Sequence, residues 1–205
     1  MPTTLTNGPR NEYGFERTTC MCHDCAKFCS YMPGYLSPLD LIQMPLAAGY
    51  TDRLAYAEKF LTASPGAVVA NKEGLLRIPT IIPRASETGA CIHFVDGRCA
   101  VHSVSPFGCA FVDEHMGERE ANRRSGLVMH TIVQDREENG MYWQTWLHLW
   151  QLGHRGPDLW PKRRTTLTQQ AMQASTKGKT MQERMLALRL LTILTTGKMK
   201  GELPA

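Results

Sequence analysis

Long apolar runs are missing from this chain of 205 residues. No stretch reaches the roughly 18–20 apolar residues that span a bilayer, and residues 1–11 lack the apolar segment of a secretory signal. These absences predict a cytoplasmic protein with no membrane partner. In a reducing compartment, clustered cysteines are metal ligands or redox groups more often than disulfides.

The motifs of several functional classes are missing as well. The chain has no Gly-rich phosphate loop, no Ser–His–Asp signature, no internal repeat and no nucleic-acid motif. Residues 151–205 are nevertheless basic, with ten Lys or Arg against three Asp or Glu, whereas the rest carries thirteen against sixteen. We interpret this basic region as a solvated helix surface rather than a nucleic-acid site. The expected partner is an unknown protein or a redox partner.

What the chain does contain is cysteine in an unusual arrangement. Four thiols occupy ten residues in the spacing C-x-C-x2-C-x3-C: Cys20, Cys22, Cys25 and Cys29. Three more follow far along the chain: Cys91, Cys99 and Cys109. A C-x2-C pair is a chelate, because one tight turn aims both thiols at one ion. We predict a metal site built from both groups of cysteines.

The metal is open at this stage. An iron–sulfur cluster is the first choice, because short C-x2-C runs hold such clusters together with a cysteine from elsewhere. Zinc is the second choice, and it could recruit His23, His93 or His102 to complete a tetrahedral set. His102 and His115 flank Cys109 and could support the site, although we favour their interpretation as ordinary surface or hydrogen-bonded histidines.

Two other interpretations of the cysteines stay open. Cys20 is as compatible with simple packing as with ligation, because a single cysteine is commonly a small buried apolar residue. A thiol–disulfide redox role for Cys22 and Cys25 is the second, although the strand-then-helix context typical of that chemistry is missing.

The apolar and turn patterns predict an α+β fold, with a small irregular cysteine-rich metal-binding domain, short hairpins and C-terminal helices. We expect an N-terminal arm over 1–18, the cysteine-cluster domain over 19–138, and a helical extension over 139–205 packed on it. One hairpin should turn at 71–74 and another at Asp96-Gly97, since Asp and Gly tolerate positive φ. Helices are expected over 52–62, 118–124, 141–152, 165–175 and 180–194, and a strand over 127–133.

The cysteine pattern resembles the YkgJ-type domain, a family described as zinc- or iron-chelating. The matching pieces are Ser37-Pro38-Leu39-Asp40-Leu41, Gly89-Ala90-Cys91, Asp96-Gly97-Arg98-Cys99-Ala100-Val101 and Pro106-Phe107-Gly108-Cys109. The resemblance covers roughly residues 20–113 and implies metal binding through Cys22, Cys25, Cys29, Cys91, Cys99 and Cys109. The chain departs from the family in lacking adjacent cysteines in its first cluster and basic residues around the last motif.

Three functions fit these observations. The first is an iron–sulfur or iron-binding protein with a role in redox chemistry, cluster handling or a linked modification. The second is a zinc-stabilised interaction module with a basic helical tail. The third is an enzyme that modifies a protein or peptide with the cluster at its active site, for which Asp113 and Glu114 could supply acid–base groups.

Overall fold

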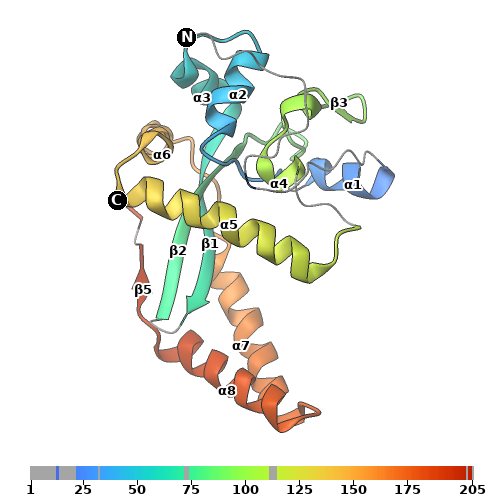
Figure 1. The fold of residues 1–205 in the computed structure, drawn as a ribbon, viewed down its shortest axis with the longest axis vertical. Coiled ribbons are helices and arrows are strands. Elements are labelled where there is room, and N and C mark those ends of the chain that lie inside the picture. The colour runs from blue at the N-terminus through green and yellow to red at the C-terminus, as the bar shows by residue number, and fades with distance from the viewer. Residues whose placement is uncertain are drawn as a thin grey trace. The chain divides into compact units, whose positions relative to one another are not determined.

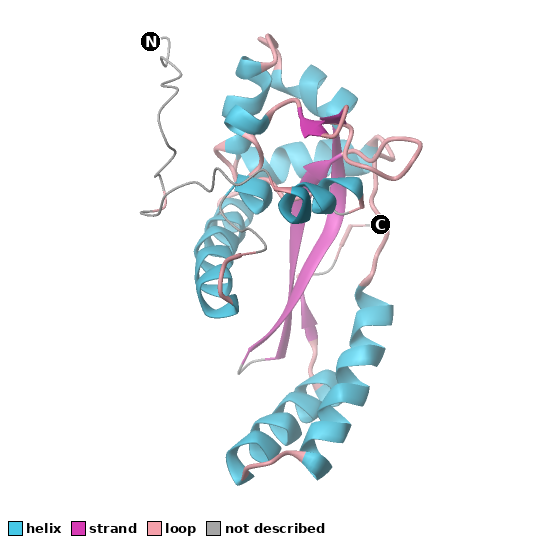
Figure 2. Cartoon of the chain, turned by 90° about the vertical axis from the view of Figure 1, so that its right-hand side faces the viewer, coloured by secondary structure: helices cyan, strands magenta, loops and turns pink. Residues whose placement is uncertain are grey.

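The computed structural model describes residue 13 and residues 22–31, 33–71, 74–110, 115–201 and 203–204. Across these residues, helices combine with a three-stranded and a two-stranded sheet, so the predicted α+β class with C-terminal helices is confirmed (Figures 1 and 2). The chain forms two compact units, Met1–Ala63 with Thr80–Arg155, and Ser64–Pro79 with Gly156–Ala205. The expected division into 1–18, 19–138 and 139–205 stays a prediction, and the arm lies outside the described residues apart from Tyr13.

The first unit contains the cysteines and most of the short elements. Its helices and short strands are α1 (His23–Lys27), the 3-10 turn η1 (Phe28–Ser30), α2 (Asp40–Ala47), α3 (Arg53–Phe60), β3 (Phe94–Val95), β4 (Arg98–Cys99), the 3-10 turn η2 (His102–Val104), α4 (Phe107–Ala110), α5 (Glu118–Glu137) and α6 (Met141–Gln151). Its core includes the fully buried side chains of Leu36, Leu41, Tyr56, Trp146 and Leu149. The apolar face of α6 therefore belongs to the core.

Two long strands continue through both units. They are β1 (Leu61–Asn71) and β2 (Gly74–Pro83), which are neighbours in the larger sheet, as the hairpin expected around 71–74 requires. Both strands are longer than the apolar runs alone indicate. β1 begins directly where α3 ends, and it passes through Pro65 and Gly66, which look like turn residues in the sequence.

The strand expected over 127–133 is wrong. These residues lie inside α5, which runs without interruption from Glu118 to Glu137. Val128 and Ile132 are its buried residues, and their i, i+4 spacing places them on one helical face. Gly126 does not end the helix, because an isolated glycine weakens a helix without breaking it.

The second unit consists of a helical hairpin and an edge of the larger sheet. α7 (Trp160–Lys177) and α8 (Met181–Thr196) lie side by side, as both ribbon views show, and β5 (Met199–Lys200) pairs in parallel with β2 (Figures 1 and 2). Their core contains Leu75, Trp160, Ala171 and Leu194. None of the described helices has both the length and the apolarity needed to cross a membrane.

Candidate metal site

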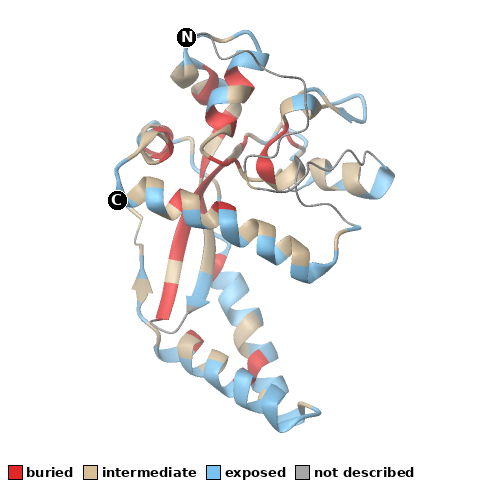
Figure 3. Ribbon diagram, viewed as in Figure 1, coloured by how far each residue is buried: buried red, intermediate tan, exposed pale blue. Residues whose placement is uncertain are grey.

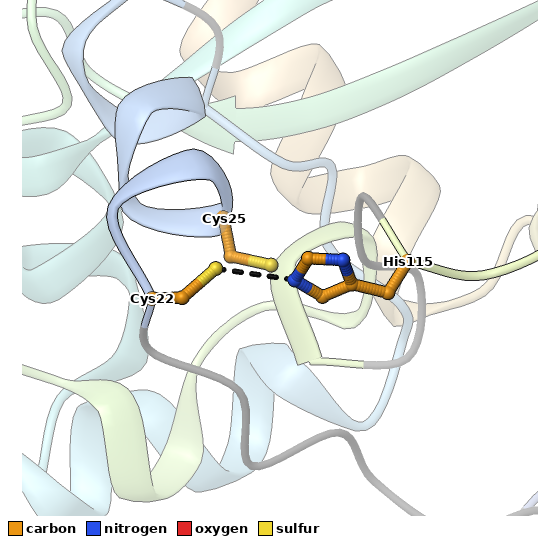
Figure 4. A group of neighbouring side chains, drawn as sticks. All are labelled: Cys22, Cys25 and His115. Atoms are coloured by element: carbon orange, nitrogen blue, oxygen red, sulfur yellow. Dashed lines mark hydrogen bonds between the residues drawn. The ribbon is translucent and has the colours of Figure 1, made fainter.

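Two of the predicted ligands are held at the start of α1. Cys22 is the residue before the helix, with φ −64° and ψ 165°, and its carbonyl accepts the Ala26 amide at 2.9 Å. Cys25 follows one turn later, so both thiols face the same side (Figure 4). Cys22 is exposed and Cys25 is partly exposed. The C-x2-C spacing thus places both thiols on one side of the helix start, as the sequence predicts; that they chelate a metal stays a prediction.

The third member of this group comes from the segment that leads into α5. The Nε2 atom of His115 lies 3.2 Å from the Sγ atom of Cys22, although the residues are 93 positions apart in the chain. The donor atoms of Cys22, Cys25 and His115 all lie within 4.8 Å of one another (Figure 4). This group could hold a metal ion. We call it the Cys2His group.

Four further described cysteines, Cys29, Cys91, Cys99 and Cys109, lie close enough to shift one another's pKa values. Cys29 and Cys109 form a side-chain hydrogen bond, which lowers the pKa of the Cys29 thiol to about 7 despite its partial burial. The same hydrogen bond, together with burial, holds the pKa of Cys109 well above its usual value. In this pair Cys109 is the hydrogen-bond donor and the Cys29 sulfur is the acceptor. The Gly34 amide also donates to the Cys109 sulfur at 3.3 Å.

Cys91 and Cys99 reach this second group through the short hairpin. Its turn residues Asp96 and Gly97 have φ values of 49° and 74°, as the sequence predicts, and Phe94 pairs with Cys99. The Cys91 amide donates to the Cys29 carbonyl at 2.8 Å. Burial, together with the nearby thiols of Cys99 and Cys29, raises the pKa of the Cys91 thiol to about 11. We call Cys29, Cys91, Cys99 and Cys109 the four-thiol group.

Asp40 holds the Cys109 turn in place. Its fully buried carboxylate accepts the Ser37 amide at 2.6 Å and the Phe107 amide at 2.9 Å. Gly108 allows the chain to come this close, because a Cβ atom there would stand 2.7 Å from the Tyr35 nitrogen. The Ser37–Leu41 segment and the Pro106–Cys109 segment, singled out separately in the sequence, are thus parts of one packed unit.

Cys22 and Cys25 come together with His115, and Cys29 lies near the remote cysteines. Whether these residues serve one metal centre or two stays open, as in the sequence. Cys20, Asp113 and Glu114 lie outside the described residues. Whether each cysteine binds metal stays a prediction.

The histidines considered as zinc ligands take other positions. The His93 ring is buried and lies 3.3 Å from the Tyr56 hydroxyl, and the exposed ring of His23 lies beside Asp24. His102 begins η2. His115 is the histidine whose place in this group the sequence did not indicate clearly. The one hint of a role as a ligand was its position six residues after Cys109.

No protein-family model, no curated protein and no solved structure matches this chain. Its function is therefore inferred from the chemistry of its own residues.

Proposed function

We propose that this chain is a metal-binding protein whose Cys2His group holds a single zinc ion. The observation that carries the proposal is the spacing of the three donor atoms, all within 4.8 Å of one another. Donors of a tetrahedral zinc ion, with bonds of about 2.0–2.3 Å, lie about 3.3–3.8 Å apart. Small side-chain rotations would bring Cys22, Cys25 and His115 to that spacing.

The donor types favour a single ion over a cluster at this group. Two thiolates and one imidazole are ligands that suit zinc. The four thiolates of a [4Fe–4S] cluster bind four different iron atoms and so stand further apart than donors on one ion. Three protein ligands also leave a fourth zinc position for water, a substrate or another residue, as in catalytic zinc sites.

A second candidate function rests on the four-thiol group. Cys29, Cys91, Cys99 and Cys109 are close enough to shift one another's pKa values. Among the described residues, however, no three of them meet the single-ion spacing of the Cys2His group. Four thiolates with wider spacing suit an iron–sulfur cluster, and the amide of Gly34 beside Cys109 is the kind of donor that stabilises a ligand sulfur. A role in redox chemistry or cluster handling follows from that ligation.

The resemblance to YkgJ-type domains supports metal binding by both groups. The family is described as binding zinc or iron, so the resemblance is compatible with either metal at each group. The zinc-stabilised interaction module and the cluster protein are therefore compatible functions of one chain.

The test of the zinc proposal is metal analysis after anaerobic purification. Cys25→Ser and His115→Gln should each lose the one bound zinc, because each removes a donor from a three-ligand set. His130→Gln, at an exposed histidine of α5, is the matched control and should keep it. Full zinc content in both ligand variants would contradict the proposal.

The cluster candidate has a separate signature. A cluster-bound protein contains iron and sulfide and is brown, with absorbance at about 400 nm. These properties should be lost in Cys91→Ser and Cys109→Ser and retained in Cys25→Ser. A colourless, air-stable wild-type protein without iron would rule out the cluster and leave the zinc proposal intact.

A further inference from the structure

Helix α8 is apolar on two sides. One side belongs to the core of the second unit, where Leu190, Leu191 and Leu194 pack with Leu75 and Trp160. A single buried face is what a surface helix needs to be held in place. The second apolar side therefore requires a separate explanation.

The second side faces solvent. Met181, Met185 and Leu188 follow the spacing i, i+4, i+7 and are 74%, 55% and 46% exposed. Figure 3 shows α8 exposed along most of its length. This spacing is that of the anchor residues by which helices dock against one another. We call these three residues the outer stripe.

The charges beside the outer stripe have one sign. Arg184 lies four residues before Leu188, and Arg189 lies four residues after Met185, so each flanks the stripe. Residues 160–196 carry seven Lys or Arg and one acidic side chain, Glu183. That carboxylate is engaged in the capping box with Thr180, where it accepts the Thr180 amide at 3.1 Å.

The composition and charge of α8 favour one kind of partner for the outer stripe over three others: a membrane, a second copy of this chain and nucleic acid. A membrane-binding helix carries Trp, Phe or Leu on its apolar side, and aromatic residues anchor it at the interface. Residues 181–196 supply leucine but contain no aromatic anchor. A second copy packed stripe to stripe would bring Arg184 and Arg189 against their own counterparts, which is repulsive. Nucleic acid would use the arginines and leave the methionines unpaired.

We propose that the outer stripe docks an amphipathic helix of a partner protein, with apolar residues at helical spacing and acidic residues on both flanks. The apolar anchors would cover Met181, Met185 and Leu188, and the acidic flanks would meet Arg184 and Arg189. Methionine suits such a surface, because its flexible side chain adapts to the partner. This inference is independent of the metal-binding proposal.

The probe is a synthetic helical peptide of about five turns, with leucines at i, i+4, i+7 flanked by glutamates, and its binding to the full chain is measured by fluorescence anisotropy. Leu188→Ala and Arg189→Glu should each weaken binding about tenfold or more, as for central apolar and charged interface residues. Leu127→Ala and Arg119→Glu, at exposed positions of α5, are the matched controls and should change binding less than about twofold. Circular dichroism verifies that every variant folds.

A charge swap sharpens the test. The same peptide with lysines in place of glutamates should bind Arg189→Glu more tightly than wild type, because the pairing of signs is restored in part. Equal binding of a scrambled peptide, or equal losses in the α5 controls, would overturn the proposal. Stripe-dependent binding to phosphatidylserine vesicles without peptide binding, or a stripe-dependent dimer in light scattering, would overturn it in favour of a membrane or a second copy.

Discussion

Tyr142 shows what a single polar atom does in the core of the first unit. Its ring is buried, and its hydroxyl accepts the Ile81 amide at 2.7 Å and donates to the Leu36 carbonyl at 3.0 Å. Burial holds the pKa of this hydroxyl well above its usual value, so it stays protonated and able to donate. One side chain of α6 thus joins β2 to the segment before α2.

Removing that hydroxyl should be costly. Tyr142→Phe leaves a buried amide and a buried carbonyl unsatisfied, and we expect the free energy of unfolding to fall by about 1–3 kcal/mol. Urea denaturation measures the change. Tyr31→Phe, at a tyrosine that is 55% exposed, should shift stability by less than about 0.5 kcal/mol. Equal effects of the two variants would show that the hydroxyl contacts contribute little.

His154 makes stability depend on pH. Its Nδ1 atom lies 2.8 Å from an Arg84 nitrogen, and partial burial together with the Arg84 charge lowers the pKa of the imidazole. The unfolded chain therefore binds the proton more readily than the folded one, so stability falls as pH drops through about 6.5. The loss ends once the pH is below the lowered pKa of the folded state.

The comparison that isolates this effect is urea denaturation at pH 7.5 and pH 5.5 for wild type and His154→Gln. The difference between the two pH values should be smaller in the variant, because glutamine cannot take up a proton. An unchanged difference would assign the pH dependence to other groups.

At the scale of elements, two glycines have opposite effects on stability. Gly126 lies within α5, and a Cβ atom there would meet nothing within 4 Å. At Gly34, a Cβ atom would stand 2.5 Å from the Cys109 sulfur and 2.6 Å from the Cys109 nitrogen. The first glycine only weakens its helix, whereas the second lets two segments of the four-thiol group approach each other.

Alanine at these two positions should therefore have opposite effects. Gly126→Ala should raise the free energy of unfolding by about 0.5–1 kcal/mol, because alanine has the higher helix propensity. Gly34→Ala should lower it by about 1–3 kcal/mol through steric overlap with backbone atoms. Thermal denaturation of wild type and both variants measures whether each change raises or lowers stability. A loss of stability in Gly126→Ala would contradict a continuous α5.

At the scale of the whole molecule, zinc binding should appear as stability. If Cys22, Cys25 and His115 hold zinc in the folded state alone, free zinc at about a thousandfold its dissociation constant adds about 4 kcal/mol to the free energy of unfolding. Thermal denaturation of the chelated protein with and without added zinc measures this gain. The gain should vanish in Cys25→Ser and persist in His130→Gln, whereas a gain that survives Cys25→Ser would place the stabilising ion elsewhere.

The sequence by itself determined the α+β class, the C-terminal helices and the Asp96-Gly97 hairpin. Each depends on local chemistry, such as helical periodicity or the tolerance of Asp and Gly for positive φ. It missed the full length of α5, because Gly126 and the β-branched residues after it look like an interruption unless Val128 and Ile132 are known to share one buried face.

Only the tertiary structure decided which distant residues approach the first cysteines. The Cys91 amide pairs with the Cys29 carbonyl, which brings Cys29 to the remote thiols. His115 approaches Cys22 from 93 residues away. Contacts at that separation depend on how the segments pack, and no local pattern in the sequence encodes them.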